Sequence, residues 1–396
     1  MPPRRSRGFK QVVVEVTEAC NHACLHCYNY WRPNRVSPIV SGPVHPGSPC
    51  RKPLSREEIV RLVRRIRRHE PIDSVGISGG EPLLRPDLAG IITDLTLEGL
   101  GVVTITNGSL LTESRLQHVP EGSYFEVTLF STNRECHNFL AGRDCFDVVV
   151  ANLDRLPRHK CHFVLAIVLT RLNVCDVMQT IELGIALGTR AVMLNRVNLG
   201  RQALAIAHDL VPSPAELREA LQQADRAAEK YGVGVAVSVP VPPCVVDPRD
   251  YPHLHFGWCP RGSDDAYYTI GCTGLLRPCN HSSLILGDLR KRSFTSIVKS
   301  AKARAFWAPV PQQCATCTHP LKDSCAGGCR AAAVECYGDV NKIDPFVAFS
   351  LAASHREASP LPLWRSRNGQ TVGHGMQGNT ALATTALPNR EQAGLP

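Results

Sequence analysis

Short apolar runs alternate with amphipathic stretches between residues 12 and 231. The runs are rich in β-branched residues, which favours buried strands, while the intervening stretches repeat their apolar positions with helical spacing. Strands are predicted at 12–16, 74–77, 102–106, 124–130, 162–169 and 191–195. Helices are predicted at 55–69, 86–98, 146–156, 175–187 and 213–231. This alternation predicts an α/β fold in which parallel strands and right-handed crossovers form an open or closed barrel.

Two of these helices carry recognisable start signals. Ser55 precedes the first helix and is followed three residues later by Glu58, the pattern of a capping box. Ser213 precedes the last helix, and Pro214 occupies its first turn, where proline is favoured. The strands between such helices end at one edge of the sheet, where the chemistry of barrels of this kind is found.

The composition of the chain changes along its 396 residues, which are enough for more than one domain. Prolines at 240, 242, 243 and 248 mark the clearest change. We expect a basic tail at 1–10, a barrel domain at 11–240, a small Cys-rich domain at 241–350 and a disordered tail at 351–396. Residues 31–53 are rich in Pro, Gly and Ser and predict a long loop.

Charge and cysteine usage narrow the class of protein. The net charge of +9 comes largely from the N-terminal tail and from residues 61–68, which fit a solvated helix face, and no nucleic-acid-binding motif accompanies it. No apolar run is long enough to span a bilayer, and the N-terminus does not fit a signal peptide. We therefore expect a cytoplasmic protein. In that reducing compartment its 17 cysteines indicate metal binding or catalysis rather than disulfides.

Three of these cysteines follow the first predicted strand. Cys20, Cys24 and Cys27 have the spacing C-x3-C-x2-C, and three thiolates on one short loop can bind three irons of a cubane cluster and leave the fourth open. A structural zinc site is the alternative, but it usually has four ligands, and only His22 and His26 lie nearby. An odd trio cannot pair internally as disulfides.

A glycine-rich turn follows the second predicted strand, at Gly79-Gly80-Glu81-Pro82. Two adjacent glycines let the backbone approach a ligand closely, and exposed carbonyls or Glu81 can accept hydrogen bonds from an ammonium group. Taken alone, such a sequence is an ordinary turn. One strand–helix unit after the cysteine trio, it indicates a ligand site.

Together these motifs resemble the radical SAM superfamily, whose open iron binds S-adenosylmethionine (SAM). The resemblance runs from about Val12 to Pro345, and its one departure in the trio is His26, where the family usually has an aromatic residue. It implies a partial (β/α)6, TIM-like barrel and a [4Fe–4S] cluster on the trio. The implied SAM contacts are Tyr28, Gly79, Gly80, Glu81, Pro82, Asn107 and Ser131, although a turn and a helix cap explain Asn107 and Ser131 nearly as well.

The Cys-rich region resembles the SPASM domain of radical SAM peptide-modifying enzymes, which extends the chain with auxiliary iron–sulfur clusters. Its seven-cysteine pattern maps onto Cys259, Cys279, Cys314, Cys317, Cys325, Cys329 and Cys336, with a gap before Cys325 that is two residues longer than usual. The resemblance implies one auxiliary [4Fe–4S] cluster on Cys259, Cys279 and Cys329, with Cys272 as candidate fourth ligand. It implies a second on Cys314, Cys317, Cys325 and Cys336. Two zinc sites are the alternative.

The remaining cysteines have no predicted metal role. Those at 161 and 175 flank a predicted strand and helix and are expected to be small buried hydrophobes. Any thiol facing the barrel could donate a hydrogen atom. The thiols without an assignment are Cys50, Cys136, Cys145, Cys161, Cys175 and Cys244.

The resemblance also implies an activity: reductive cleavage of SAM, followed by hydrogen-atom abstraction from a substrate. Family precedent favours a ribosomally synthesised peptide that gains a thioether, a carbon–carbon crosslink, an epimerised residue or an oxidised side chain. The alternatives are modification of a small molecule or tetrapyrrole, as in haem-pathway relatives, and a non-catalytic iron–sulfur electron carrier. The expected partners are the substrate and a reductant such as flavodoxin or ferredoxin. A separate peptide-recognition protein is also expected, because no N-terminal peptide-recognition domain precedes the first strand. A membrane is not an expected partner.

Overall fold

The computed structural model describes residues 10–29, 52–307 and 310–354, with no side chains described for residues 201 and 202. The predicted loop at 31–53 therefore lies almost entirely outside the described residues, as does Cys50. So does most of the predicted basic tail.

One curved sheet organises the described part of the chain. Its order is β11-β10-β9-β1-β2-β3-β4-β5-β6-β7-β8. The parallel strands from β1 to β8 are β1 (Gln11–Thr17), β2 (Ser74–Gly79), β3 (Gly101–Thr106), β4 (Tyr124–Thr128), β5 (His162–Leu169), β6 (Ala191–Arg196), β7 (Gly234–Val237) and β8 (Leu254–Phe256). The predicted α/β partial barrel is thus confirmed, and its six expected strands are followed by two more.

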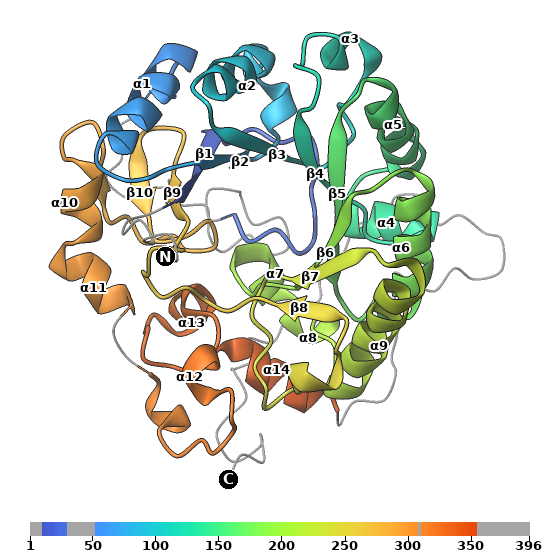
Figure 1. The fold of residues 1–396 in the computed structure, drawn as a ribbon. Helices are drawn as coiled ribbons and strands as arrows, with labels where there is room; N and C mark the ends of the chain where they lie inside the picture. The colour runs from blue at the N-terminus through green and yellow to red at the C-terminus, as the bar shows by residue number, and fades with distance from the viewer. Residues whose placement is uncertain (1–9, 30–51, 308–309, 355–396) are drawn as a thin grey trace, which may run out of the picture.

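The outer face of the sheet is covered by helices (Figure 1). They are α1 (Arg56–Arg67), α2 (Leu88–Leu97), α3 (Glu113–Leu116), α4 (Arg134–Ala141), α5 (Phe146–Arg158), α6 (Val177–Ala186) and α9 (Pro214–Tyr231). Two short helices, α7 (Arg201–Ala205) and α8 (Ala207–Leu210), follow β6 and do not belong to this outer layer. Both predicted helix starts are confirmed. Ser55 and Glu58 exchange hydrogen bonds of 2.8 and 3.2 Å, and Ser213 forms the same reciprocal pair with Glu216. Such caps satisfy amide groups that a helix leaves unpaired at its start.

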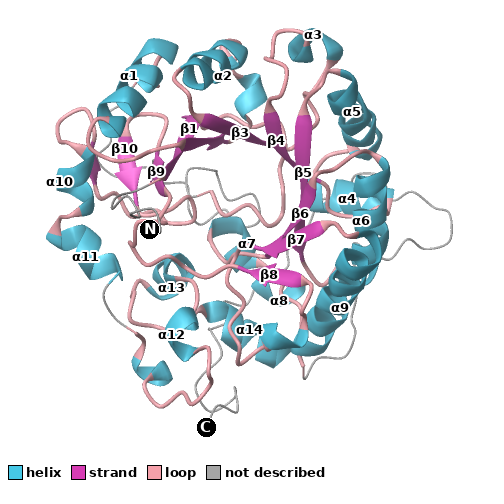
Figure 2. Cartoon of the chain, in the orientation of Figure 1, coloured by secondary structure: helices cyan, strands magenta, loops and turns pink. Residues whose placement is uncertain are grey.

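The Cys-rich region continues the same sheet. β9 (Tyr268–Ile270) pairs in parallel with β1, and β10 (Leu275–Arg277) and β11 (Gly287–Asp288) follow as antiparallel strands. The sheet does not close, and α13 and loops of the Cys-rich region lie between its two ends (Figure 2). The helices here are α10 (Phe294–Val298), α11 (Ala301–Trp307), α12 (Lys322–Cys325), α13 (Arg330–Tyr337) and α14 (Pro345–Ala353).

Helix α14 corrects one expectation. The disordered tail was expected to begin at residue 351. The helix instead runs to Ala353, and it lacks an amphipathic period because residues around most of its circumference are buried. Residues 355–396 lie outside the described part of the chain.

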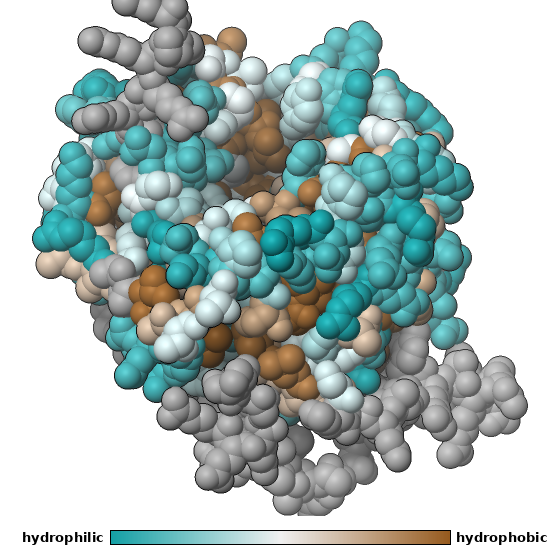
Figure 3. Space-filling model, turned by 60° about the horizontal axis from the view of Figure 1, so that its bottom comes forward, coloured by the Kyte–Doolittle hydropathy of each residue, from teal (hydrophilic) through white to brown (hydrophobic). Residues whose placement is uncertain are grey.

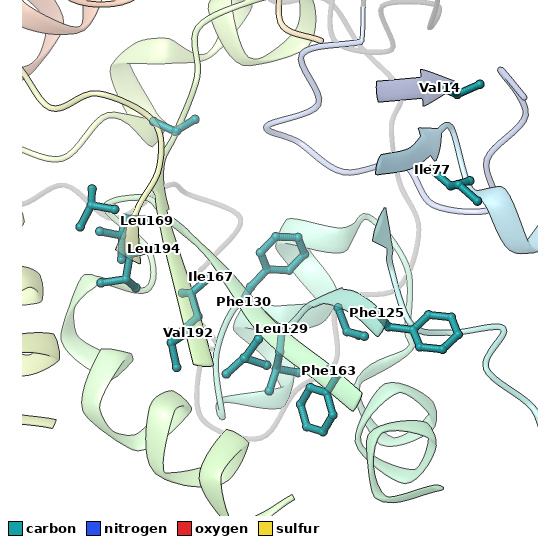
Figure 4. Close-up of a cluster of buried hydrophobic side chains, with 14 of the residues drawn as sticks. Val14, Ile77, Phe125, Leu129, Phe130, Phe163, Ile167, Leu169, Val192 and Leu194 are labelled. Atoms are coloured by element: carbon teal, nitrogen blue, oxygen red, sulfur yellow. The ribbon is translucent and has the colours of Figure 1, made fainter. Parts of the chain in front are cut away.

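The main hydrophobic core lies between the sheet and its helices. Val14 of β1 and Ile77 of β2 are in register and almost completely buried, and Phe125 and Phe163 extend the same layer along β4 and β5 (Figure 4). Burying one such side chain stabilises a fold by roughly 1.5–3 kcal/mol. Phe130 lies on the other side of these strands, toward the barrel interior. The inner side of the sheet, which faces away from this core, therefore carries polar groups and lines a cavity.

Candidate functional site

The three cysteines of the first motif lie on one loop at the carboxyl end of β1. Helix α4 supports this loop, because the amides of Ala23 and Leu25 donate to the carbonyls of Ala141 and Leu140 at 3.1 and 3.0 Å. Gly142, which ends α4 at φ +62°, packs so tightly that an added Cβ would lie 2.3 Å from the carbonyl oxygen of Ala23. The loop is therefore fixed by backbone contacts independent of its thiols.

The thiols of this loop line a cavity at the carboxyl ends of β1 to β4. The molecule is hollowed near the middle of the face shown in Figure 3, where hydrophobic residues are visible. The lining combines polar groups with apolar ones such as Ile105 and Phe130. The predicted site residues in the lining are Cys20, Cys24, Cys27, Tyr28, Gly79, Gly80 and Asn107.

The two glycines are required by the cysteine loop itself. The Gly80 amide donates to the carbonyl of Thr17 at 2.8 Å, and the next amide, that of Glu81, donates to the carbonyl of Ala19 at 2.7 Å. A Cβ on Gly80 would stand 2.1 Å from the Ala19 oxygen, and Gly79 adopts φ +139°, which other residues rarely adopt. We expected these glycines to let a ligand come close to the backbone. In the structure they let the backbone after β1, at Thr17 and Ala19, come close.

Glu81 is directed away from the cavity. Its carboxylate is fully buried and accepts hydrogen bonds from the Leu83 amide at 3.0 Å, the Thr106 hydroxyl at 2.8 Å and the Asn107 amide at 2.8 Å. Burial raises the pKa of this carboxyl, and the hydrogen bonds oppose the rise. The carboxylate thus holds the end of β3 in place. Neither it nor the buried Pro82 contributes to the cavity lining, and that both contact SAM stays a prediction.

Asn107 belongs to a polar network at the rim of the cavity. Its side-chain amide donates to Asn21 at 2.9 Å and its oxygen accepts from the Ser109 hydroxyl at 2.7 Å. Ser109 also contacts His22 at 3.1 Å, so the network joins β3 to the cysteine loop. Ser131 is different. It is buried, donates to the Asp176 carboxylate and accepts from the Asn133 amide at 2.9 Å, and it does not line the cavity.

Tyr28 connects the cysteine loop to the Cys-rich region. Its hydroxyl accepts a hydrogen bond from Asn280 at 3.0 Å, and its ring meets His281 edge-on with the ring centres 4.4 Å apart. Burial raises the pKa of Tyr28 above its usual range, so the hydroxyl stays protonated. Asn280 and His281 directly follow Cys279. The two cysteine-bearing regions are therefore in contact across the open side of the barrel.

Two buried ion pairs strengthen the junction between barrel and Cys-rich region. Glu15 of β1 pairs with Arg277 of β10, and Arg196 at the end of β6 pairs with Asp344, which also accepts the Cys329 amide at 2.8 Å. All four side chains are almost completely excluded from water. Such pairs are costly to break, because a lone buried charge remains.

The cysteines of the Cys-rich region fall into two groups. In the first, burial raises the pKa of Cys279, and the nearby thiols of Cys329 and Cys259 raise it further. The charges that act on Cys272 are those of Glu18 and Glu15. In the second, Cys314, Cys317 and Cys325 line a smaller cavity together with Cys244, which the sequence left without an assignment.

The first group has a feature that fits an anionic cofactor. Arg330 is 3% exposed, and both terminal nitrogens of its guanidinium lack a hydrogen-bond partner among the described residues. The thiols of Cys259 and Cys329 are near enough to favour its positive charge, while burial lowers its pKa. A buried cation without a partner is expensive unless a negative group joins it. Within the described ranges, no three side chains of His, Cys, Asp or Glu stand close enough to share one metal ion.

Two further polar groups were missed by the sequence argument. Asn198 follows β6, is 6% exposed, and neither atom of its side-chain amide has a partner among the described residues. Glu126 lies on the inner face of β4, two residues before Thr128, which lines the large cavity. Burial raises the pKa of Glu126 to about 7. The sequence offered only weak signals for these two residues. Glu126 is a lone acidic residue within a predicted strand, and Asn198 is an asparagine just after another predicted strand.

Comparison with known proteins decides the family. Residues 14–184 match the model of the radical SAM superfamily, and residues 259–318 match that of an iron–sulfur cluster-binding domain, SPASM. The chain belongs to the radical SAM superfamily. Its cofactors are [4Fe–4S] clusters and SAM, and it is a SAM-dependent enzyme with a SPASM domain, as the sequence predicted.

Solved structures share the radical SAM fold of this chain. SuiB of Streptococcus suis bound to S-adenosylmethionine is 15% identical with a TM-score of 0.64, covering 85% of this chain and 76% of SuiB. SuiB bound to its precursor peptide SuiA is 12% identical with a TM-score of 0.65, covering 85% and 75%. The protein anSMEcpe with bound AdoMet and the Cp18Cys peptide is 14% identical with a TM-score of 0.59, covering 87% and 94%. In the described part of this radical SAM chain, no helix combines the length and apolarity that crossing a membrane requires.

Proposed function

We propose that this radical SAM enzyme modifies a ribosomally synthesised peptide inside its barrel. The observation that carries the proposal is the cavity at the carboxyl ends of β1 to β4, in which the cysteine trio faces Gly79 and Asn107. When bound there, the cluster would supply the electron that cleaves SAM, and SAM would supply the radical that removes a hydrogen atom from the substrate. Cys20, Cys24 and Cys27 are the proposed cluster ligands.

The chain's own residues would then position the cofactor and exclude water. Ile105 and Phe130 provide the apolar part of the cavity wall, which suits chemistry that water would quench. The backbone contacts of Gly80 and Glu81 fix the distance between the glycine turn and the cysteine loop. Gly79 and Gly80 would contact SAM through their backbone, and Asn107 through its side chain. The buried Glu81 would act only by holding β3.

Glu126 has the properties of a proton acceptor for the substrate. It shares the inner face of β4 with Thr128, its pKa lies near 7, and no hydrogen bond or ion pair to another described residue holds its carboxylate. A general base works best when its pKa lies near the working pH. Oxidation of a side chain after hydrogen abstraction releases one proton and one electron. Glu126 would take the proton, and the SPASM clusters would take the electron.

One observation favours a peptide over a small molecule. SuiB and anSMEcpe, which share the fold, were solved with peptides bound. A reductant such as flavodoxin or ferredoxin would supply the electron that starts each turnover, and a separate protein would present the peptide.

Deuterium transfer tests this function directly. The reconstituted enzyme is incubated with SAM, dithionite and candidate precursor peptides encoded beside its gene, each prepared with deuterated side chains. The proposal predicts deuterium in 5′-deoxyadenosine and a matching mass change in one peptide. The variant with Cys20, Cys24 and Cys27 changed to Ala serves as control and should give neither. Deuterium transfer only from small molecules or tetrapyrroles would reject the peptide substrate.

A further inference from the structure

The second cysteine group contains a fourth thiol that the seven-cysteine pattern does not supply. Cys244 lies in the segment between β7 and β8, far in sequence from Cys314, Cys317 and Cys325, yet all four line the same cavity. Four thiols around one cavity are the ligand set of a closed [4Fe–4S] cluster.

Backbone and side-chain contacts hold Cys244 at this cavity. The Val245 amide donates to the carbonyl of Pro242 at 2.9 Å, which closes a tight turn around Cys244. Three residues after it, the Asp247 carboxylate contacts the ring of His319 at 3.1 Å, and His319 lies two residues beyond Cys317. The turn that bears Cys244 is thus tied to the C-x2-C segment by a contact that does not involve the thiols.

Cys336, the fourth ligand that the resemblance implied, does not line this cavity. It lies on α13, seven residues after Cys329, which is about 10 Å along a helix. Cys272, the other spare thiol of the region, does not line the cavity either. Neither residue is therefore placed to complete the second group.

We propose that Cys244 is the fourth ligand of the second auxiliary cluster, which Cys244, Cys314, Cys317 and Cys325 bind together. The segment between the barrel and the Cys-rich region is then covalently joined to the cluster through iron. Because Cys244 is otherwise exposed, the cluster covers a thiol that would be open to oxidation. The proposal rests only on the iron–sulfur content of the proposed function and not on its substrate.

Thiol alkylation of the unmodified protein tests the assignment without any variant. The anaerobic, cluster-loaded enzyme is treated with iodoacetamide, and each cysteine is followed by mass spectrometry before and after the clusters are stripped. Cys175, which was expected to be buried, is exposed and serves as the control, which should react at the same rate in both states. Cys244 should react at least tenfold more slowly in the loaded enzyme. Equal rates for Cys244 in both states, with Cys314 protected, would overturn the proposal.

Iron counting in variants gives an independent readout. In a background with Cys20, Cys24 and Cys27 changed to Ala, two auxiliary cubanes contain about eight irons per chain. Cys244→Ala should lower this value to about four, or leave a three-iron centre visible by electron paramagnetic resonance. Cys175→Ala should leave it unchanged, and circular dichroism checks that each variant is folded. A Cys244→Ala protein that keeps all its irons would contradict the assignment, whatever the enzyme's substrate.

Discussion

Gly80→Ala is the substitution whose effect the structure determines most directly. The new Cβ would stand 2.1 Å from the carbonyl oxygen of Ala19 and 2.6 Å from its carbon. Contacts below 3.0 Å are essentially never seen for real Cβ atoms, so the two segments must separate by about 1 Å. The displaced atoms are backbone, and a flexible side chain cannot absorb the change.

The size of the effect follows from the contacts that separation breaks. The Gly80 and Glu81 amides would lose their bonds to Thr17 and Ala19, each worth about 0.5–1.5 kcal/mol. We therefore expect a loss of about 1–3 kcal/mol in the free energy of unfolding. Cys20 directly follows Ala19, so the cluster loop would move with it. A misplacement of about 1 Å can lower a rate roughly 100-fold.

The assay compares Gly80→Ala with a matched control, Gly76→Ala, on β2, the strand that ends just before Gly80. Gly76→Ala places its Cβ at an ordinary 3.4 Å from a methyl group of Val13 and should be nearly neutral. Urea denaturation gives the stability of each variant, and 5′-deoxyadenosine formation gives the rate of SAM cleavage. Wild-type stability and SAM cleavage in Gly80→Ala would refute the close-approach argument.

Three further predictions concern buried charges. Below a pH of about 7 Glu126 is protonated and cannot accept a proton, so kcat/KM for the peptide should rise as the pH increases through 7. Glu126→Gln should remove this rise while SAM cleavage persists. If Glu126→Gln keeps the wild-type pH profile, Glu126 is not the base. Arg330→Leu removes a cation beside the first cysteine group and should make the midpoint potential of the cluster bound there more negative in a redox titration. Arg330→Lys keeps the charge and should have a potential close to that of the wild type. Equal potentials in Arg330→Leu and wild type would contradict this role of Arg330. Asp344→Asn leaves Arg196 buried and unpaired and should lower the free energy of unfolding by about 3–5 kcal/mol. The control, Asp154→Asn, breaks an exposed pair and should lower it by less than about 1 kcal/mol. Equal losses in the two variants would show that burial of the pair is unimportant.

The barrel was predictable because its strands and helices are long enough to show a period. Strands β1 to β6 each contain at least five residues, and the helices α1 and α9 begin with capping boxes. By contrast, β8 to β10 contain three residues each, too few for any alternation to be recognised. Their place beside β1 and β7 depends on pairing between distant segments. Helix α14 was missed because a helix buried on most sides has no amphipathic pattern.

The candidate site was predicted unevenly for a physical reason. Short-range spacing identifies residues of one loop, as with Cys20, Cys24 and Cys27, because the chain itself holds them together. Glu81 was assigned to the ligand since sequence does not reveal that its carboxylate binds the backbone of β3. Cys244 has no partner at a motif spacing, and only the fold brings it to the second group.

The most direct test of this enzyme's identity is the anaerobically reconstituted protein itself, measured for iron, zinc and 5′-deoxyadenosine formed from SAM and dithionite. Three cubanes predict about twelve irons per chain, little zinc, and 5′-deoxyadenosine that disappears when Cys20, Cys24 and Cys27 are changed to Ala. Zinc in place of iron, or a full complement of clusters without SAM cleavage, would contradict a radical SAM enzyme and leave a structural metalloprotein.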